Sequence, residues 1–222
     1  MALKVNEIFY SLQGEGTRAG RPCLFIRLTG CPLRCTYCDT AYAFTEGTFM
    51  ERETLLAETV RRLGPPRPGP NAPFVEVTGG EPLAQGETPR LLQELLDLGY
   101  EVALETAGSH DLRPVPPAVV KIVDRKTPGS GEGHRWLESN LEFLIPGQDE
   151  LKFVLSDEAD YHWAKAWCEE RGLFQRHDLL FSPVWQRLDP RWLAERMLAD
   201  GLAARFQLQL HKLIWEPERR GV

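Results

Sequence analysis

Strand-like and helix-like segments alternate along most of the chain, and this alternation restricts the possible folds more than any other feature. Short apolar, β-branched runs predict strands, and apolar residues at helical spacing predict the helices between them. The alternation predicts an α/β fold in which parallel strands carry helices on their outer side. The predicted strands are residues 22–29, 74–78, 101–106, 119–124, 151–155 and 179–183, with a strand-like run at 206–210, and the predicted helices are 51–63, 88–98, 158–172 and 189–201.

The number of these units predicts the architecture. About six strand–helix units fall short of the eight that close a (β/α) barrel. We therefore expect a partial barrel of about six parallel strands. The alternation is equally compatible with an open doubly wound sheet, which is the alternative. A length of 222 residues suits a single domain over residues 1–222. The Pro- and Gly-rich residues 64–70 predict a surface loop.

Composition and charge exclude several classes of function. The net charge is −6 and the basic residues are scattered among acids, so nothing predicts a nucleic-acid surface. No apolar run approaches the roughly 20 residues that a membrane crossing requires, and the polar first residues do not resemble a secretory signal. The five cysteines are an odd number with three in one cluster, which favours a reducing compartment. We expect a cytoplasmic protein without nucleic-acid or membrane partners.

Three cysteines follow the first predicted strand with the spacing Cys-x3-Cys-x2-Cys, at Cys31, Cys35 and Cys38. Thiolates bind metals and iron–sulfur clusters, and three ligands on a four-iron cluster leave one iron open to a small molecule. A zinc site usually has four ligands, and the nearest histidine is the distant His110. A Cys-x2-Cys redox pair would leave Cys31 unexplained. The spacing favours the cluster, and the other two interpretations stay open.

A glycine pair follows the predicted strand 74–78, in the segment Gly79-Gly80-Glu81-Pro82. Glycines let the backbone approach a ligand closely because no Cβ intervenes, and the Glu81 carboxylate suits an ammonium group. A tight turn at the end of the strand explains the motif equally well. The ligand-binding interpretation is favoured because several unusual segments follow predicted strands. Active sites of such folds lie at the carboxyl ends of their parallel strands.

Arg27 lies in the otherwise apolar strand 22–29. Alternation puts Arg27 on the face of Phe25, opposite to the aliphatic side chains of the same strand. A buried guanidinium requires an anion, which would be either a substrate carboxylate or the partner in an internal salt bridge.

Other polar segments are candidates with simpler alternatives. Residues 13–16, Gln-Gly-Glu-Gly, lack the context of a phosphate loop; they would line a pocket for a flat heterocycle or form a plain hairpin. The Thr40 hydroxyl suits Mg2+ or a helix cap. Lys152, in the predicted strand 151–155, and His211-Lys212, directly after the strand-like run 206–210, are further candidate polar groups.

The segment 25–40 resembles the radical S-adenosylmethionine enzymes. With residues 13–16 and Gln209-Leu210-His211-Lys212, the chain is similar over nearly its whole length to the 7-carboxy-7-deazaguanine synthase family. This resemblance implies a 4Fe–4S cluster on the three cysteines, with S-adenosylmethionine on the open iron. It also implies conversion of 6-carboxy-5,6,7,8-tetrahydropterin to 7-carboxy-7-deazaguanine with release of ammonia, in the biosynthesis of queuosine-type 7-deazapurines. An activase that acts on a protein glycine is the alternative within the superfamily.

The resemblance also implies roles for individual residues. A Mg2+ ion shared with the substrate, a homodimer and an electron donor such as flavodoxin or ferredoxin are expected. One departure is Asp124-Arg125-Lys126, where members of the family often have Ser-Pro-Lys. The expected pterin contacts are Leu12, Gln13, Gly14, Arg27, Thr78 and the terminal Val222; the expected S-adenosylmethionine contacts are Tyr37, Cys38, Asp39, Gly80, Glu81 and Lys126; and Thr40 would bind Mg2+.

Overall fold

The computed structural model describes residues 2–222, and within them nine strands form one sheet in the order β3-β1-β2-β4-β5-β6-β7-β8-β9. From β2 to β9 every neighbouring pair is parallel, and the order does not return on itself. The sheet is therefore a partial barrel, as the alternation predicts. Its parallel strands are β2 (Pro22–Leu28), β4 (Phe74–Gly79), β5 (Val102–Thr106), β6 (Val120–Asp124), β7 (Glu150–Leu155), β8 (Asp178–Pro183) and the short β9 (Arg205–Phe206).

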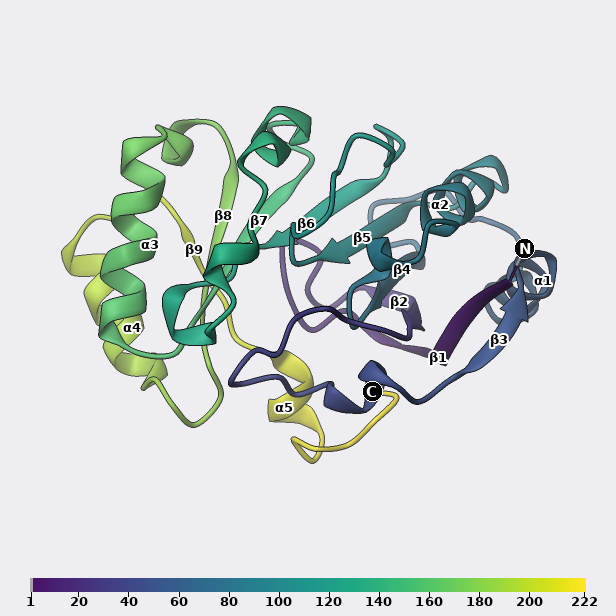
Figure 1. Cartoon of the computed structure of the whole chain (residues 1–222), viewed down its shortest axis with the longest axis horizontal. Helices are drawn as coiled ribbons and strands as arrows, with labels where there is room; N and C mark the ends of the chain where they lie inside the picture. The colour runs from purple at the N-terminus through teal and green to yellow at the C-terminus, as the bar shows by residue number, and fades with distance from the viewer. Residues whose placement is uncertain (1) are drawn as a thin grey trace.

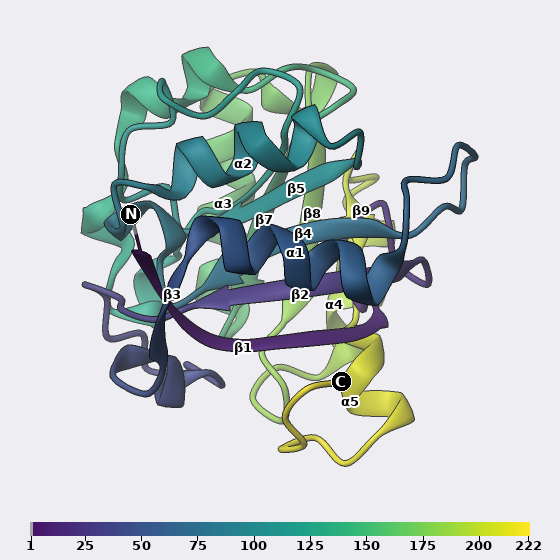
Figure 2. The ribbon, with the colours of Figure 1, turned by 90° about the vertical axis from the view of Figure 1, so that its right-hand side faces the viewer.

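Four helices cover the outer side of the sheet. Figure 1 shows the strands as an arc, with α3 and α4 beside the end formed by β8 and β9. In this view α5 and the dark blue segment that contains the cysteines lie below the arc. In Figure 2, α1 and α2 lie in front of β1, β2, β4 and β5. The helices are α1 (Arg52–Leu63), α2 (Thr88–Asp97), α3 (Glu158–Glu170), α4 (Pro190–Ala199) and α5 (Leu210–Ile214). Short 3-10 helices are η1 (Ala41–Phe44), η2 (Pro82–Ala84), η3 (Pro128–Ser130), η4 (Gly133–Arg135), η5 (Glu138–Phe143) and η6 (Leu173–Gln175).

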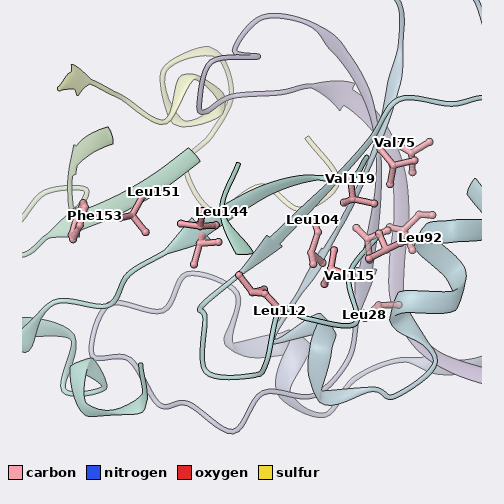
Figure 3. Packing of buried hydrophobic residues seen from close by; sticks show 14 of the residues in the cluster. Leu28, Val75, Leu92, Leu104, Leu112, Val115, Val119, Leu144, Leu151 and Phe153 are labelled. Atoms are coloured by element: carbon pink, nitrogen blue, oxygen red, sulfur yellow. The ribbon is translucent and has the colours of Figure 1, made fainter. Parts of the chain in front are cut away.

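The hydrophobic core lies mainly between the sheet and this outer layer. Alternate residues of the strands, such as Leu24 and Ile26 of β2, pack with the leucines of α2 in one buried cluster. Figure 3 shows Leu28, Val75 and Leu104 near Leu92 of α2. Burying each such side chain stabilises the fold by about 1.5–3 kcal/mol.

A smaller apolar cluster lies on the inner face of the sheet. It contains Phe9, Cys23, Phe25, Phe74, Ala103, Val120 and Ile122. Arg27 shares this inner face with Phe25, as the alternation of β2 predicts, since both line the same cavity. The free thiols of Cys23 and Cys168 are fully buried.

Two strands at one edge of the sheet are not predicted by the sequence. β1 (Ala2–Leu12) pairs antiparallel with β2 and with β3 (Thr48–Glu51). A bulge between Val5 and Glu7 switches the faces of β1, so that Val5 joins the outer core while Phe9 joins the inner cluster. The bulge interrupts the period of two, and this interruption hides the strand from a search for alternation.

The prediction of a strand over residues 206–210 is wrong beyond Phe206. β9 contains only Arg205 and Phe206, and Leu210 already begins α5. After one further backbone bond, from Gln207 to Phe181 (3.0 Å), the chain leaves the sheet. The Gln207 and Gln209 side chains donate to Glu15 instead (2.8 and 3.1 Å), and these bonds direct the segment across the inner face.

The loop over residues 64–70 is mostly exposed, as predicted. None of the helices in residues 2–222 has the length and hydropathy needed to cross a membrane.

Candidate active site

Two adjoining cavities open at the carboxyl ends of the parallel strands. The larger, of about 510 Å3, is lined by the cysteine loop and by residues that follow β4, β5 and β6; we call it the cysteine cavity. The smaller, of about 110 Å3, lies against the inner face of the sheet; we call it the inner cavity. Their shared wall is formed by Glu15, Arg27, Asp39, Thr40, Thr78, Glu105, His211, Lys212 and Glu218. Molecules in the two cavities would therefore contact the same side chains.

The three clustered cysteines all line the cysteine cavity. A single zinc ion would need their sulfurs about 4 Å apart, given Zn–S bonds near 2.3 Å. No group of three or more His, Cys, Asp or Glu side chains in residues 2–222 is arranged to hold one metal ion. Burial raises the pKa of the Cys35 thiol to about 11, so the positive charge of bound iron would be needed to form the thiolate. The structure thus places three potential thiolate ligands around one cavity.

Gly80 packs directly against the cysteine loop. A Cβ on Gly80 would lie 2.4 Å from the Gly30 oxygen and 2.7 Å from Cys31 Cβ. The backbone bonds from Gly80 to Leu28 (3.1 Å) and from Glu81 to Gly30 (2.8 Å) bind the end of β4 to the start of the loop. Only glycine allows this approach, and Gly80 also lines the cysteine cavity.

Glu81 does not take the position expected for it. Its side chain is fully buried and is not part of the cavity wall. Its carboxylate accepts hydrogen bonds from Thr106 Oγ1 (2.8 and 2.9 Å), Ala107 N (2.8 Å) and Leu83 N (3.0 Å). Both oxygens therefore bind the end of β4 to the end of β5. The predicted contact of Glu81 with a ligand ammonium group stays a prediction, because these bonds already engage its carboxylate.

Arg27 forms an internal salt bridge and still has donors that no described residue engages. Its Nε donates to Glu7 (2.8 Å), and its guanidinium lies over the rings of Phe9 and Tyr42. Burial lowers the pKa of Arg27, but Tyr42 and Glu7 outweigh burial and raise it. In the described part of the chain no hydrogen bond engages its two Nη groups, and Arg27 lines both cavities. The salt bridge thus leaves donors for an anion between the cavities.

Carboxylates surround Lys152 at the shared wall, and the Lys152 side chain itself is buried. Its Nζ donates to Glu15 (2.9 Å) and to Glu105, and Asp124 Oδ2 lies 3.9 Å away. On β4, Glu76 accepts a hydrogen bond from Gln13, and burial raises the pKa of Glu76. Glu76, Glu105 and Lys152 are polar residues in buried strands, and such residues are the sequence signal that could have identified this network.

The three motif segments of the resemblance meet beside the inner cavity. Lys212 donates to Asp39 (2.8 Å), and Leu210 N donates to the Gly14 oxygen (3.1 Å). A Cβ on Gly14 would lie 2.8 Å from His211 Nδ1, so a larger residue would displace the His211 ring. Segments distant in sequence, residues 13–16, 38–40 and 209–212, therefore form one wall.

The structure brings the expected binding residues together, apart from Glu81. The expected pterin contacts, Leu12, Gln13, Gly14, Arg27, Thr78 and Val222, all line the inner cavity. The other expected S-adenosylmethionine contacts, Tyr37, Cys38, Asp39, Gly80 and Lys126, line the cysteine cavity. Thr40 lies in the shared wall, with Oγ1 3.8 Å from Cys38 Sγ.

The cysteine cavity suits a bound cofactor. Asp124 lines the cavity, and among the described residues its buried Oδ1 has no hydrogen-bond partner. Such an acceptor fits a ligand that brings hydroxyl or ammonium donors. An open parallel sheet with a three-cysteine loop at its carboxyl edge defines the class of radical S-adenosylmethionine enzymes, and the family model of the Radical SAM superfamily matches residues 25–124.

Comparison with known proteins defines the family more closely. The chain is 42% identical over 234 residues to a 7-carboxy-7-deazaguanine synthase of Koribacter versatilis, covering 99% of this chain and 100% of the relative. It is 44% identical to a protein of that name from Chlorobaculum tepidum, covering 99% and 97%. The crystal structure of QueE from Escherichia coli matches with a TM-score of 0.73 and 26% identity, covering 93% and 94%. The chain belongs to the 7-carboxy-7-deazaguanine synthase family.

Proposed function

We propose that this chain converts 6-carboxy-5,6,7,8-tetrahydropterin to 7-carboxy-7-deazaguanine with release of ammonia, as a step in 7-deazapurine biosynthesis. The observation that carries the proposal is the wall shared by the cysteine cavity and a small polar cavity that contains a free guanidinium edge. Family membership supports it, since the relatives at 42 and 44% identity bear the name of this activity. It also decides against the alternative of an activase acting on a protein glycine.

The cysteine cavity would hold the cofactors. Cys31, Cys35 and Cys38 would bind three irons of a 4Fe–4S cluster. Tyr37 and Lys126 would border the S-adenosylmethionine that takes the open iron. Bound there, the two cofactors supply the radical that removes a hydrogen atom from the substrate. The chain's own contribution is to orient the substrate across the shared wall and to exclude water from it.

The inner cavity would hold the pterin. Carboxylates such as Glu76 can accept hydrogen bonds from the amino and ring N–H groups of a pterin. Arg27 would donate to the substrate carboxylate with its free Nη groups. Thr40 would place a hydroxyl oxygen near a Mg2+ ion shared with that carboxylate, because Mg2+ takes oxygen ligands and retains water or substrate oxygens. Residues 217–222 would cover the cavity, which they line.

Other expectations are part of the same proposal. The chain would act as one radical S-adenosylmethionine domain, as a homodimer, in the cytoplasm. A flavodoxin or ferredoxin would deliver the electron. Light scattering of the purified protein measures its oligomeric state, and turnover with each reduced carrier in place of a chemical reductant measures the donor. Omitting Mg2+ should lower turnover while the iron content stays unchanged.

The direct test incubates reduced, reconstituted protein with the carboxypterin and S-adenosylmethionine. We expect a deazapurine chromophore and ammonia in equal amounts. Cys35→Ala should abolish both, whereas Cys168→Ala should retain them, because Cys168 is buried in α3 outside both cavities. If the protein cleaves S-adenosylmethionine at a normal rate but forms neither the deazapurine nor ammonia, the proposed substrate is refuted.

A further inference from the structure

A buried arginine lies behind the cysteine loop, at a position that the proposed reaction does not use. Arg125 follows β6 and is only 6% exposed. Its guanidinium carbon lies 4.8 Å from the ring centre of Trp163, 5.2 Å from that of Trp136 and 5.3 Å from that of Trp167. No salt bridge to Arg125 is found in residues 2–222, so these three rings take the place of an acidic partner.

The guanidinium holds two carbonyl groups of the segment that follows. Nη1 donates to the oxygens of Lys126 (2.5 Å) and Gly133 (2.9 Å), which are the ends of residues 126–133; we call this segment the bracing loop. Burial lowers the pKa of Arg125 to about 10, so it remains charged at neutral pH. Charge-assisted bonds of this kind are stronger than neutral ones.

A second buried group fixes the middle of the bracing loop. Asp160 of α3 accepts from Thr127 Oγ1 (2.8 Å) and from Gly129 N (2.8 Å). Asp160 is 2% exposed and also accepts from Ser156 N (2.9 Å). The loop is therefore held from β6 by Arg125 and from α3 by Asp160.

The bracing loop in turn binds the backbone on both sides of Cys35. Ser130 O accepts from Thr36 N (3.0 Å), and Glu132 Oε1 accepts from Arg34 N (2.6 Å). Gly129 O also accepts from Thr36 Oγ1 (2.9 Å). The two amides next to Cys35 therefore have their partners in this loop.

We infer that Arg125, clamped by three tryptophans, is a positioning residue that fixes the bracing loop and thereby the backbone on both sides of Cys35. The cluster-binding role of Cys35 rests on the proposed function, but the mechanical link from Arg125 to Cys35 does not. Amide groups near an iron–sulfur cluster tune its reduction potential. Arg125 thus acts, through the bracing loop, on the two amides next to Cys35.

The test uses metal-free protein and no substrate, so that its outcome is independent of the proposed function. Alkylation of Cys35 and hydrogen exchange in the peptide containing Thr36 are followed by mass spectrometry. In Arg125→Gln we expect both to accelerate about tenfold or more, because the two bonds to the loop are lost. Alkylation of Cys23, which is fully buried in the inner apolar cluster away from Arg125, serves as the internal reference and should not change.

Arg171→Gln is the matched control. The Arg171 guanidinium carbon lies 4.3 Å from the ring centre of Trp167, but its bonds go to Glu138, Glu170 and the carbonyl of Trp167, and none goes to the bracing loop. This variant should keep the wild-type rates. Trp163→Phe retains the packing with a weaker ring and should give an intermediate increase, so the inference stays testable if Arg125→Gln does not fold.

After reconstitution, Arg125→Gln should also show an altered EPR spectrum and potential of the reduced cluster. Two results would overturn the inference. One is wild-type alkylation and exchange at Cys35 in a folded Arg125→Gln protein. The other is a uniform loss of protection along the whole chain, since Arg125 would then serve only global stability.

Discussion

Replacing Arg27 by alanine should separate substrate binding from cofactor cleavage. Arg27 is part of the wall between the two cavities, where the substrate carboxylate is proposed to lie. Loss of a charge-assisted hydrogen bond is worth about 1.5–3 kcal/mol. The corresponding increase in the KM for the carboxypterin is about 10- to 150-fold. Cleavage of S-adenosylmethionine in the absence of substrate should remain within about twofold of wild type, because Arg27 is not one of its expected contacts.

The fold should tolerate this substitution. The side chains of Arg27 and Glu7 are 14% and 20% exposed, so their salt bridge is only partly buried. Glu7 retains the hydrogen bond from the Tyr42 hydroxyl (2.9 Å). We therefore expect a loss of about 1–2 kcal/mol of stability, below the 3–5 kcal/mol of a fully buried pair.

The assay measures product formation against carboxypterin concentration and, separately, methionine released without substrate. Glu7→Gln is the control: it removes the charge partner of Arg27 but keeps an oxygen that accepts from Nε, so KM should change less than about threefold. Equal losses of substrate binding and cofactor cleavage in Arg27→Ala would contradict this account of Arg27. An increase of the same size in the KM of Glu7→Gln would show that substrate binding depends on the salt bridge and not on the free Nη donors of Arg27.

Three further predictions concern other parts of the site. Gly80→Ala should lower the iron content after reconstitution, because a Cβ would press on Cys31 at 2.7 Å; a full complement of iron would contradict this. Arg220→Ala should raise the KM for the pterin but leave cofactor cleavage unchanged, because Arg220 lies 3.7 Å over the Tyr42 ring and holds a segment lining the inner cavity. Burial lowers the pKa of His211 from 6.5, so the unfolded chain takes up the proton first and stability should fall as pH drops below about 6.5; His211→Gln should flatten this part of the stability profile.

The sequence predicts the parallel part of the sheet well, because each buried strand is a short apolar run between clear turn signals. It does not predict β1, since the bulge between Val5 and Glu7 reverses the faces of the strand. It also extends β9 too far, since Gln207 and Gln209 bind Glu15 rather than continue the ladder. Side-chain bonds between distant segments decide that course, and no local pattern records them.

The candidate site shows the same division. The cysteine spacing and the alternation of β2 identify the three cysteines and Arg27 from sequence alone, and these side chains do line the cavities. Glu81 differs because its partners, Thr106 and Ala107, lie at the end of β5, and only the fold shows that they bind both carboxylate oxygens. The resemblance suggests residues near the pterin, but the carboxylates around Lys152 become visible only when the strands are side by side.

The most direct test of the account is the EPR spectrum of the reduced, anaerobically reconstituted protein, recorded with and without S-adenosylmethionine. An iron left free by Cys31, Cys35 and Cys38 predicts about four irons per chain and a signal that changes when the cofactor is added. A signal that ignores the cofactor, or a colourless protein that contains zinc, would contradict the central claim.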